Sequence, residues 1–128
     1  MDNREIAQEW FELADYDLQS AVFLLKMKPK PLEIMAYHCQ QSVEKYLKGF
    51  LAFHGGQIKK THDLIFLTKE CQKYDALFKN IIDECINLTD YGVQVRYPFH
   101  IDIEEEDVKL AIKDAEKIKT FVLAKIAD

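Results

Sequence analysis

The sequence lacks any apolar run long enough to cross a membrane. A membrane-spanning helix needs about 20 consecutive apolar residues, and charged residues interrupt every apolar stretch well before that length. A secretory signal is also missing, because the first 25 residues carry six acidic side chains. These two absences predict a soluble cytoplasmic protein.

Cysteine pairs and metal-binding motifs are lacking as well. Cys39, Cys71 and Cys85 form an odd set without a Cys-x-x-Cys spacing, and no His-Glu-x-x-His motif occurs. We therefore expect three reduced thiols in the core, no metal and no other cofactor. The sequence has no Gly-x-Ser-x-Gly motif, and GGQIKKTH lacks the glycine order of a P-loop. Nucleophilic catalysis by a serine therefore has no support in the sequence, and nucleotide binding through a P-loop is excluded.

Apolar residues recur at helical spacing along nearly the whole chain, and no segment alternates with the period of a strand. The content of 48% hydrophobic and 30% charged residues is typical of globular proteins. A chain of 128 residues has room for one ordinary domain. We predict a single all-α domain over residues 1–128, folded as an up-and-down antiparallel helical bundle of four long helices plus one short helix.

Capping signals and apolar stripes place the five predicted helices. Thr61 is expected to cap the third helix, and Asp102 with Glu105 is expected to form a capping box for the last. The apolar stripe of the first helix includes Leu13 and Val22, which are therefore expected to be buried. The predicted helices span about residues 3–26, 32–54, 62–74, 77–96 and 103–126.

Charge is unevenly distributed along the chain. The net charge of −5 argues against indiscriminate nucleic-acid binding. Residues 26–60, however, hold seven lysines against two glutamates, so this stretch carries +5 and the remainder −10. Within it His38, Lys45 and Lys48 recur with Gln41 on one polar ridge of the second helix. We take the first three as candidate nucleotide- or RNA-binding residues, and an ordinary solvated helix face is the alternative.

The segment RYPFH, residues 96–100, carries the groups best suited to chemistry. Arg96 can bind phosphate oxygens in a forked geometry, and His100 can transfer a proton near neutral pH. Such a pair suits metal-independent RNA cleavage, in which the imidazole activates the ribose 2′-hydroxyl or protonates the leaving oxygen and the guanidinium stabilises the transition state. Tyr97 is a candidate for base stacking. The alternative is structural, with Arg96 capping helix carbonyls, Tyr97 packed on the bundle and His100 on an exposed loop.

Four segments together resemble the HEPN family, whose name means higher eukaryotes and prokaryotes nucleotide-binding. They are WFELADYDLQSA, AYHCQQSVEKYLKGFLAFHG, KTHDLIFL and RYP, and the resemblance covers roughly residues 9–126. It implies a helical bundle that is usually a homodimer. Many members are metal-independent ribonucleases with an arginine and a following histidine at the end of the fourth helix. Carried over to this sequence, these catalytic residues are Arg96 and His100, with the two sites of the dimer facing each other.

Small HEPN proteins with an RYP stretch resemble the partners of minimal nucleotidyltransferases in toxin–antitoxin modules. The resemblance therefore implies a protein that binds nucleotide or RNA and acts with such a nucleotidyltransferase. Two alternatives stay open. One is a metal-independent ribonuclease toxin that uses Arg96 and His100, and the other is a structural helical adaptor.

Overall fold

The computed structural model describes residues 1–94 and 102–127, with the side chains of all of these except positions 93 and 94. Within these ranges all regular secondary structure is helical, which confirms the predicted class. No helix of the described residues is both long and apolar enough to cross a membrane. In chain order the elements are α1 (Asn3–Phe23), η1 (Leu24–Lys26), α2 (Leu32–Phe53), α3 (Leu64–Gln72), η2 (Ala76–Ile81), α4 (Ile82–Leu88), α5 (Tyr91–Gln94) and α6 (Glu105–Ile126).

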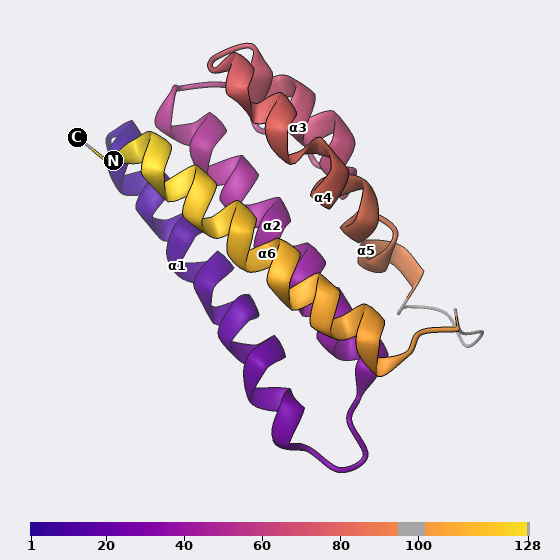
Figure 1. Ribbon diagram of the computed structural model, residues 1–128. Coiled ribbons are helices and arrows are strands. Elements are labelled where there is room, and N and C mark those ends of the chain that lie inside the picture. The colour runs from indigo at the N-terminus through magenta and orange to yellow at the C-terminus, as the bar shows by residue number, and fades with distance from the viewer. Residues whose placement is uncertain (95–101, 128) are drawn as a thin grey trace.

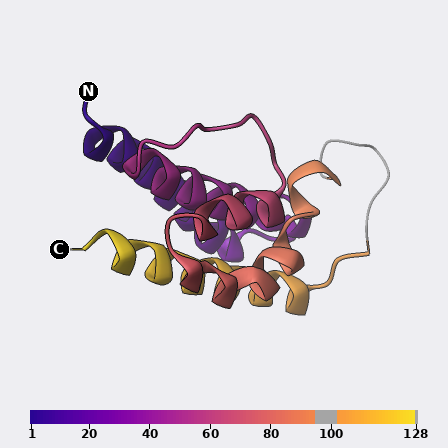
Figure 2. The ribbon, with the colours of Figure 1, turned by 90° about the horizontal axis from the view of Figure 1, so that it is seen from above.

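Three long helices form the framework of the bundle (Figure 1). α1 and α2 make an antiparallel hairpin, and α6 packs along both of them. The shorter elements α3, η2, α4 and α5 follow one another along the other side of α2, and the start of α1 and the end of α6 lie at the same end of the molecule (Figure 2). α2 is therefore central, and it buries 15 of its 22 residues. Polar side chains on such a helix must find partners within the protein.

α1 begins and ends where the sequence predicts. The Asp2 carboxylate accepts a hydrogen bond from the Glu5 amide, and a single 3₁₀ turn, η1, carries the chain to Lys26 before the prolines. The predicted apolar stripe is only partly correct, because Leu13 and Val22 are 51% and 42% exposed. The buried face is rotated toward smaller residues, and it consists of Ala7, Phe11, Ala14, Leu18 and Ala21.

The rotation of α1 follows from its close approach to α2. A Cβ atom added at Gly49 of α2 would lie 2.5 Å from the Phe11 ring, closer than real Cβ atoms approach other atoms. Glycine at this position thus leaves room for the ring, and the alanines of α1 let the two backbones come near each other. Side-chain size as well as apolar character decides which face of α1 is buried.

α3 starts two residues later than predicted. Asp63, not Thr61, is its N-cap, because the Asp63 carboxylate accepts hydrogen bonds from the amides of Ile65 and Phe66. The Thr61 hydroxyl instead accepts a hydrogen bond from the Asp63 amide and so orders the turn before the helix. A similar shift occurs at α6, where Glu104 and Asp107 form the capping box. The predicted capping box of Asp102 and Glu105 was wrong, because each of its two residues lies two positions before the observed one.

The predicted long fourth helix is broken into η2, α4 and α5. η2 begins where the Asp75 carboxylate accepts a hydrogen bond from the Leu77 amide, and Leu77 itself is half exposed. α4 ends at Leu88, and the hydroxyl of its C-cap residue, Thr89, accepts a hydrogen bond from the Leu64 amide at the start of α3. This contact ties the break between α4 and α5 to a residue 25 positions away in the sequence.

The cysteines lie in the core, as predicted. Each of the three thiols is free and fully buried. Burial raises the pKa of Cys39 to about 12 and also raises the pKa of Cys71. Burial likewise raises the pKa of Cys85 to about 12, although a hydrogen bond with Thr68 opposes the shift. The thiols are therefore protonated at neutral pH and are poor nucleophiles.

Candidate functional site

The predicted catalytic residues Arg96 and His100 and the predicted stacking residue Tyr97 lie outside the described residues. Their roles stay predictions. The site that the structure does describe is the polar face of α2, on which the other three predicted binding residues lie. It divides into two groups of charged side chains, one facing α1 and one facing the loop after α2.

The first group joins His38 and Lys45 through one carboxylate of α1. Asp17 places Oδ1 2.9 Å from His38 Nδ1 and Oδ2 2.5 Å from Lys45 Nζ. All three side chains are largely but not fully buried, with exposed fractions of 14% for Asp17, 27% for His38 and 24% for Lys45. The Asp17 carboxylate therefore holds both side chains in place.

Lys48 lies apart from Lys45, although the sequence places them on one ridge. Its side chain is only 9% exposed, its Nζ lies 3.0 Å from Glu44 Oε2, and the ammonium is 5.8 Å from the centre of the Trp10 ring. A phosphate could reach this ammonium only if the buried ion pair opened, which is costly. With the ion pair intact, Lys48 stabilises the protein interior and is not part of an exposed ridge.

Glu44 is the centre of the second group. Its Oε1 accepts hydrogen bonds from Gln40, from Gln41 and from Nδ1 of His62, the last at 2.8 Å, while Oε2 pairs with Lys48. The carboxylate is 6% exposed. Burial alone would raise the pKa of Glu44, but the hydrogen bonds from His62 and Lys48 outweigh it, and the pKa is lowered. Glu44 is therefore ionised and fully paired.

Gln40 extends this network to two further elements. Its side-chain amide donates to the His62 carbonyl at 3.0 Å, and its Oε1 accepts from Gln41. A Cβ atom added at Gly92 would lie 2.6 Å from the same amide, so α5 rests directly on it. The network thus holds the loop before α3 and the helix that immediately precedes residues 95–101 in the chain.

Sequence analysis did not identify this network, because His62 lies 18 positions from Glu44 and outside the second helix. A signal was present in α2 itself. Gln40, Glu44 and Lys48 follow one another at intervals of four residues, so they share one face of the helix. That face lies next to the apolar stripe, and the structure buries all three side chains.

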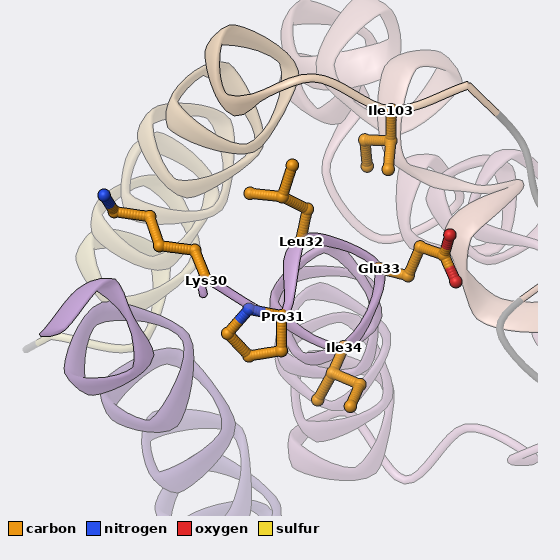
Figure 3. A pocket seen from close by; sticks show the side chains of 6 residues that line it. All are labelled: Lys30, Pro31, Leu32, Glu33, Ile34 and Ile103. Carbon is orange, nitrogen blue, oxygen red and sulfur yellow. The ribbon is translucent and has the colours of Figure 1, made fainter. Parts of the chain in front are cut away.

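A hollow of about 340 Å³ lies at the start of α2, and Figure 3 shows the side chains around it. Leu32 and Ile34 point in opposite directions, while Lys30 and Glu33 extend to either side. The Lys30 ammonium is 3.3 Å from Glu105 Oε1, so its charge is already balanced by a carboxylate of α6. Four of the six lining residues, Pro31, Leu32, Ile34 and Ile103, are apolar, so the hollow offers few groups for chemistry.

A second hollow, between α4, α5 and α6, is lined by two acidic side chains, Asp107 and Asp114. Asp114 is 7% exposed, and burial raises its pKa, although a hydrogen bond from Asn87 opposes the shift. In the part of the chain that the structure describes, no three histidine, cysteine or acidic side chains are grouped so that they could hold a metal ion.

Comparison with known proteins gives a consistent result. The profile of a family described as "HEPN domain" matches residues 7–126. A protein of Methanocaldococcus jannaschii named "Putative toxin MJ1304" is 28% identical over 131 residues, which cover 91% of this chain and 85% of that protein.

Two solved structures share the fold. TT1696 from Thermus thermophilus superposes with a TM-score of 0.79 at 21% identity, covering 93% of this chain and 97% of that one. ST0689, described as an archaeal HEPN homologue, superposes with a TM-score of 0.74 at 23% identity, covering 94% of this chain and 98% of that one. The helical bundle predicted from the sequence is thus a fold that these proteins have in common.

Proposed function

The chain belongs to the HEPN family, and from this premise we propose that it is a nucleotide- or RNA-binding protein of a toxin–antitoxin-like module. We further propose that it works as a homodimer with a minimal nucleotidyltransferase as its partner. The observation that carries the proposal is the family match over residues 7–126, together with the similarity to a protein whose name describes it as a toxin.

The geometry of α2 supports the binding part of this proposal. The imidazole of His38 and the ammonium of Lys45 are both held by the one carboxylate of Asp17, so two groups that can contact phosphate lie on the same face. Both side chains keep about a quarter of their surface exposed. In contrast, Lys48 is neutralised within the protein and is the weaker candidate of the three.

The test of the partner is co-expression of the tagged chain with the nucleotidyltransferase encoded beside it. We expect the two proteins to copurify, and expression of the chain alone to slow growth more than expression of the pair. Light scattering on the purified chain tests the homodimer. A neighbourhood without such an enzyme, or no copurification, contradicts the partner.

Binding is tested by titrating a labelled oligoribonucleotide at roughly 50 mM and 200 mM salt, where phosphate contacts must weaken as salt rises. Measurable binding that weakens with salt agrees with the proposal. No binding at either salt concentration contradicts it and leaves the helical adaptor as the explanation.

A second candidate function, metal-independent RNA cleavage, is favoured by the pair Arg96 and His100 that follows α5 in the sequence. The guanidinium would stabilise the transition state and the imidazole would transfer the proton. The test is hydrolysis of RNA by the purified protein in EDTA. Activity that Arg96→Ala and His100→Ala each abolish would establish the ribonuclease, and no hydrolysis at micromolar protein would reject it.

A further inference from the structure

An open hollow of about 470 Å³ lies where the second half of α1 meets the start of α2. Two of its walls are aromatic rings that the bundle does not use, since Tyr16 and Phe23 are each 68% exposed. They are seven residues apart, which places them on one side of α1 about 10.5 Å apart along the helix axis. The lining residues are Tyr16, Gln19, Ser20, Phe23, Leu24 and His38.

His38 brings the Asp17 group to this hollow. Asp17 engages Nδ1 of the imidazole, so Nε2 is the ring nitrogen left for a ligand. Lys45 pairs with the other oxygen of the same carboxylate, and this pairing reduces the repulsion that Asp17 would exert on an anion. An oriented histidine therefore lies beside two exposed rings.

A lysine lies close to one of the two rings. Lys26 of η1, which lines a neighbouring hollow rather than this one, places its ammonium 5.6 Å from the centre of the Phe23 ring. The polar groups between the rings are already engaged within α1, because the Ser20 hydroxyl donates to the Tyr16 carbonyl and the Gln19 amide donates to Asp15. The hollow thus presents two aromatic rings and the His38 imidazole, with the Lys26 ammonium next to one of the rings.

We propose that this hollow binds a nucleotide, either free or within single-stranded RNA. Stacking of a base on Tyr16 or Phe23 would provide contact without sequence preference, and His38 and Lys26 would bind the phosphate groups. This assignment rests on the proposed nucleotide- or RNA-binding function, and it locates that function on the α1–α2 face. The ligand combines a flat ring with negative charge, and this matches two exposed rings with an imidazole and a nearby ammonium better than a purely apolar partner does.

The experiment measures the affinity of the purified full-length protein for a short labelled oligouridylate by fluorescence anisotropy, and for AMP by calorimetry. We expect Tyr16→Ala and Phe23→Ala each to weaken binding by about tenfold, the effect of losing one stacked base. Tyr16→Phe and Phe23→Tyr keep the ring and should bind like the wild type. Leu13→Ala removes a comparably exposed apolar side chain of α1 that does not line the hollow, and it is the matched control.

The outcomes separate this assignment from the function on which it rests. Weaker binding in the two alanine variants, with wild-type binding in the control and unchanged circular dichroism, supports the hollow as the site. Binding of AMP identifies a free nucleotide, and binding of the oligouridylate alone identifies RNA.

Wild-type affinity in both alanine variants overturns the location and leaves the proposed function standing. A wild-type protein that binds neither probe overturns both. If the alanine variants instead lower the molar mass measured by light scattering and bind the probes normally, a second copy of the chain covers the rings and the assignment is wrong.

Discussion

Nδ1 of His62 lies 2.8 Å from Oε1 of Glu44, a contact between a loop residue and the central helix across 18 positions of sequence. The histidine side chain is 43% exposed, whereas the carboxylate is 6% exposed. A half-exposed histidine thus pairs with a buried carboxylate. Lys48, Gln40 and Gln41 provide the other hydrogen bonds to that carboxylate. The loop between α2 and α3 is held to the bundle by this polar network.

Glu44→Gln should destabilise the protein by about 3–5 kcal/mol near pH 7, because it leaves the Lys48 ammonium buried without a counter-charge. Urea unfolding followed by circular dichroism measures the difference. Glu106→Gln, at a side chain that is 83% exposed, is the control and should change the free energy of unfolding by less than about 0.5 kcal/mol.

The same variant has a predictable pH dependence. Since the folded-state pKa of Glu44 is lowered, its stabilising effect is complete above the pKa of an unfolded glutamate, about 4.3, and is lost as the pH falls through the folded value. The wild type should therefore lose stability below about pH 4.3 more steeply than Glu44→Gln does. Parallel curves for the two proteins would contradict the lowered pKa.

Gly92→Ala should destabilise the protein by about 1–3 kcal/mol, because the new methyl group overlaps the Gln40 amide. Removing that amide makes room, so the double variant Gln40→Ala with Gly92→Ala should lose less than the sum of the two single variants. Thermal unfolding of the four proteins gives the coupling energy. Additive losses would mean that α5 does not rest on Gln40.

Asp114→Asn should stabilise the protein near neutral pH by on the order of 1 kcal/mol, because it removes a buried negative charge and can keep a hydrogen bond with Asn87. Burial raises the pKa of Asp114, so this carboxyl group favours the folded state at low pH and disfavours it as the pH rises through the folded value. The advantage of the variant should accordingly shrink toward about pH 4. Asp83→Asn, at an exposed position of α4, is the control, and an advantage that grew on acidification would reverse the assigned direction.

Lys45→Ala should weaken binding of the oligoribonucleotide and reduce the slope of log affinity against log salt by about one, the effect of one lost phosphate contact. The slope is measured by repeating the anisotropy titration over a series of salt concentrations. Lys79→Ala, at an exposed lysine of η2 far along the chain from α2, controls for loss of a positive charge as such. An equal change of slope in both variants would mean that the contact at Lys45 is not specific.

The three thiols should react with Ellman's reagent only slowly in the folded protein. They are fully buried, and their raised pKa values keep them protonated at neutral pH. Addition of guanidinium chloride should expose all three at once. Rapid labelling of one thiol under native conditions would show that its helix opens locally.

Much of the fold could be predicted from the sequence because helix formation depends on neighbours in the chain. The spacing of apolar residues identified α1, α2 and α6 within a few residues of their observed ends. The same reasoning failed for the fourth helix, since apolar spacing does not register that Asp75 caps the 3₁₀ helix η2 or that Thr89, just after α4, contacts the distant Leu64. It also assigned Leu13 and Val22 to the buried face of α1, because periodicity does not register how closely Gly49 lets α1 approach.

Only part of the candidate site could be predicted from the sequence, because spacing along one helix does not show which residues of another helix lie nearby. His38 and Lys45 could be placed on one side of α2 from their spacing, but Asp17, their common partner, lies 21 and 28 residues away on another helix. Lys48 belongs to the same ridge by spacing, yet α1 covers it with Trp10 and Glu44 neutralises it.

The sequence by itself determined that this protein is helical, where its helices turn back, and that it belongs with the HEPN proteins, because each of these properties depends on residues close together in the chain. Only the tertiary structure decided which polar side chains of α2 are buried and which are exposed at the surface. Burial depends on what packs against a helix from other parts of the chain, and no periodic pattern within that helix contains this information.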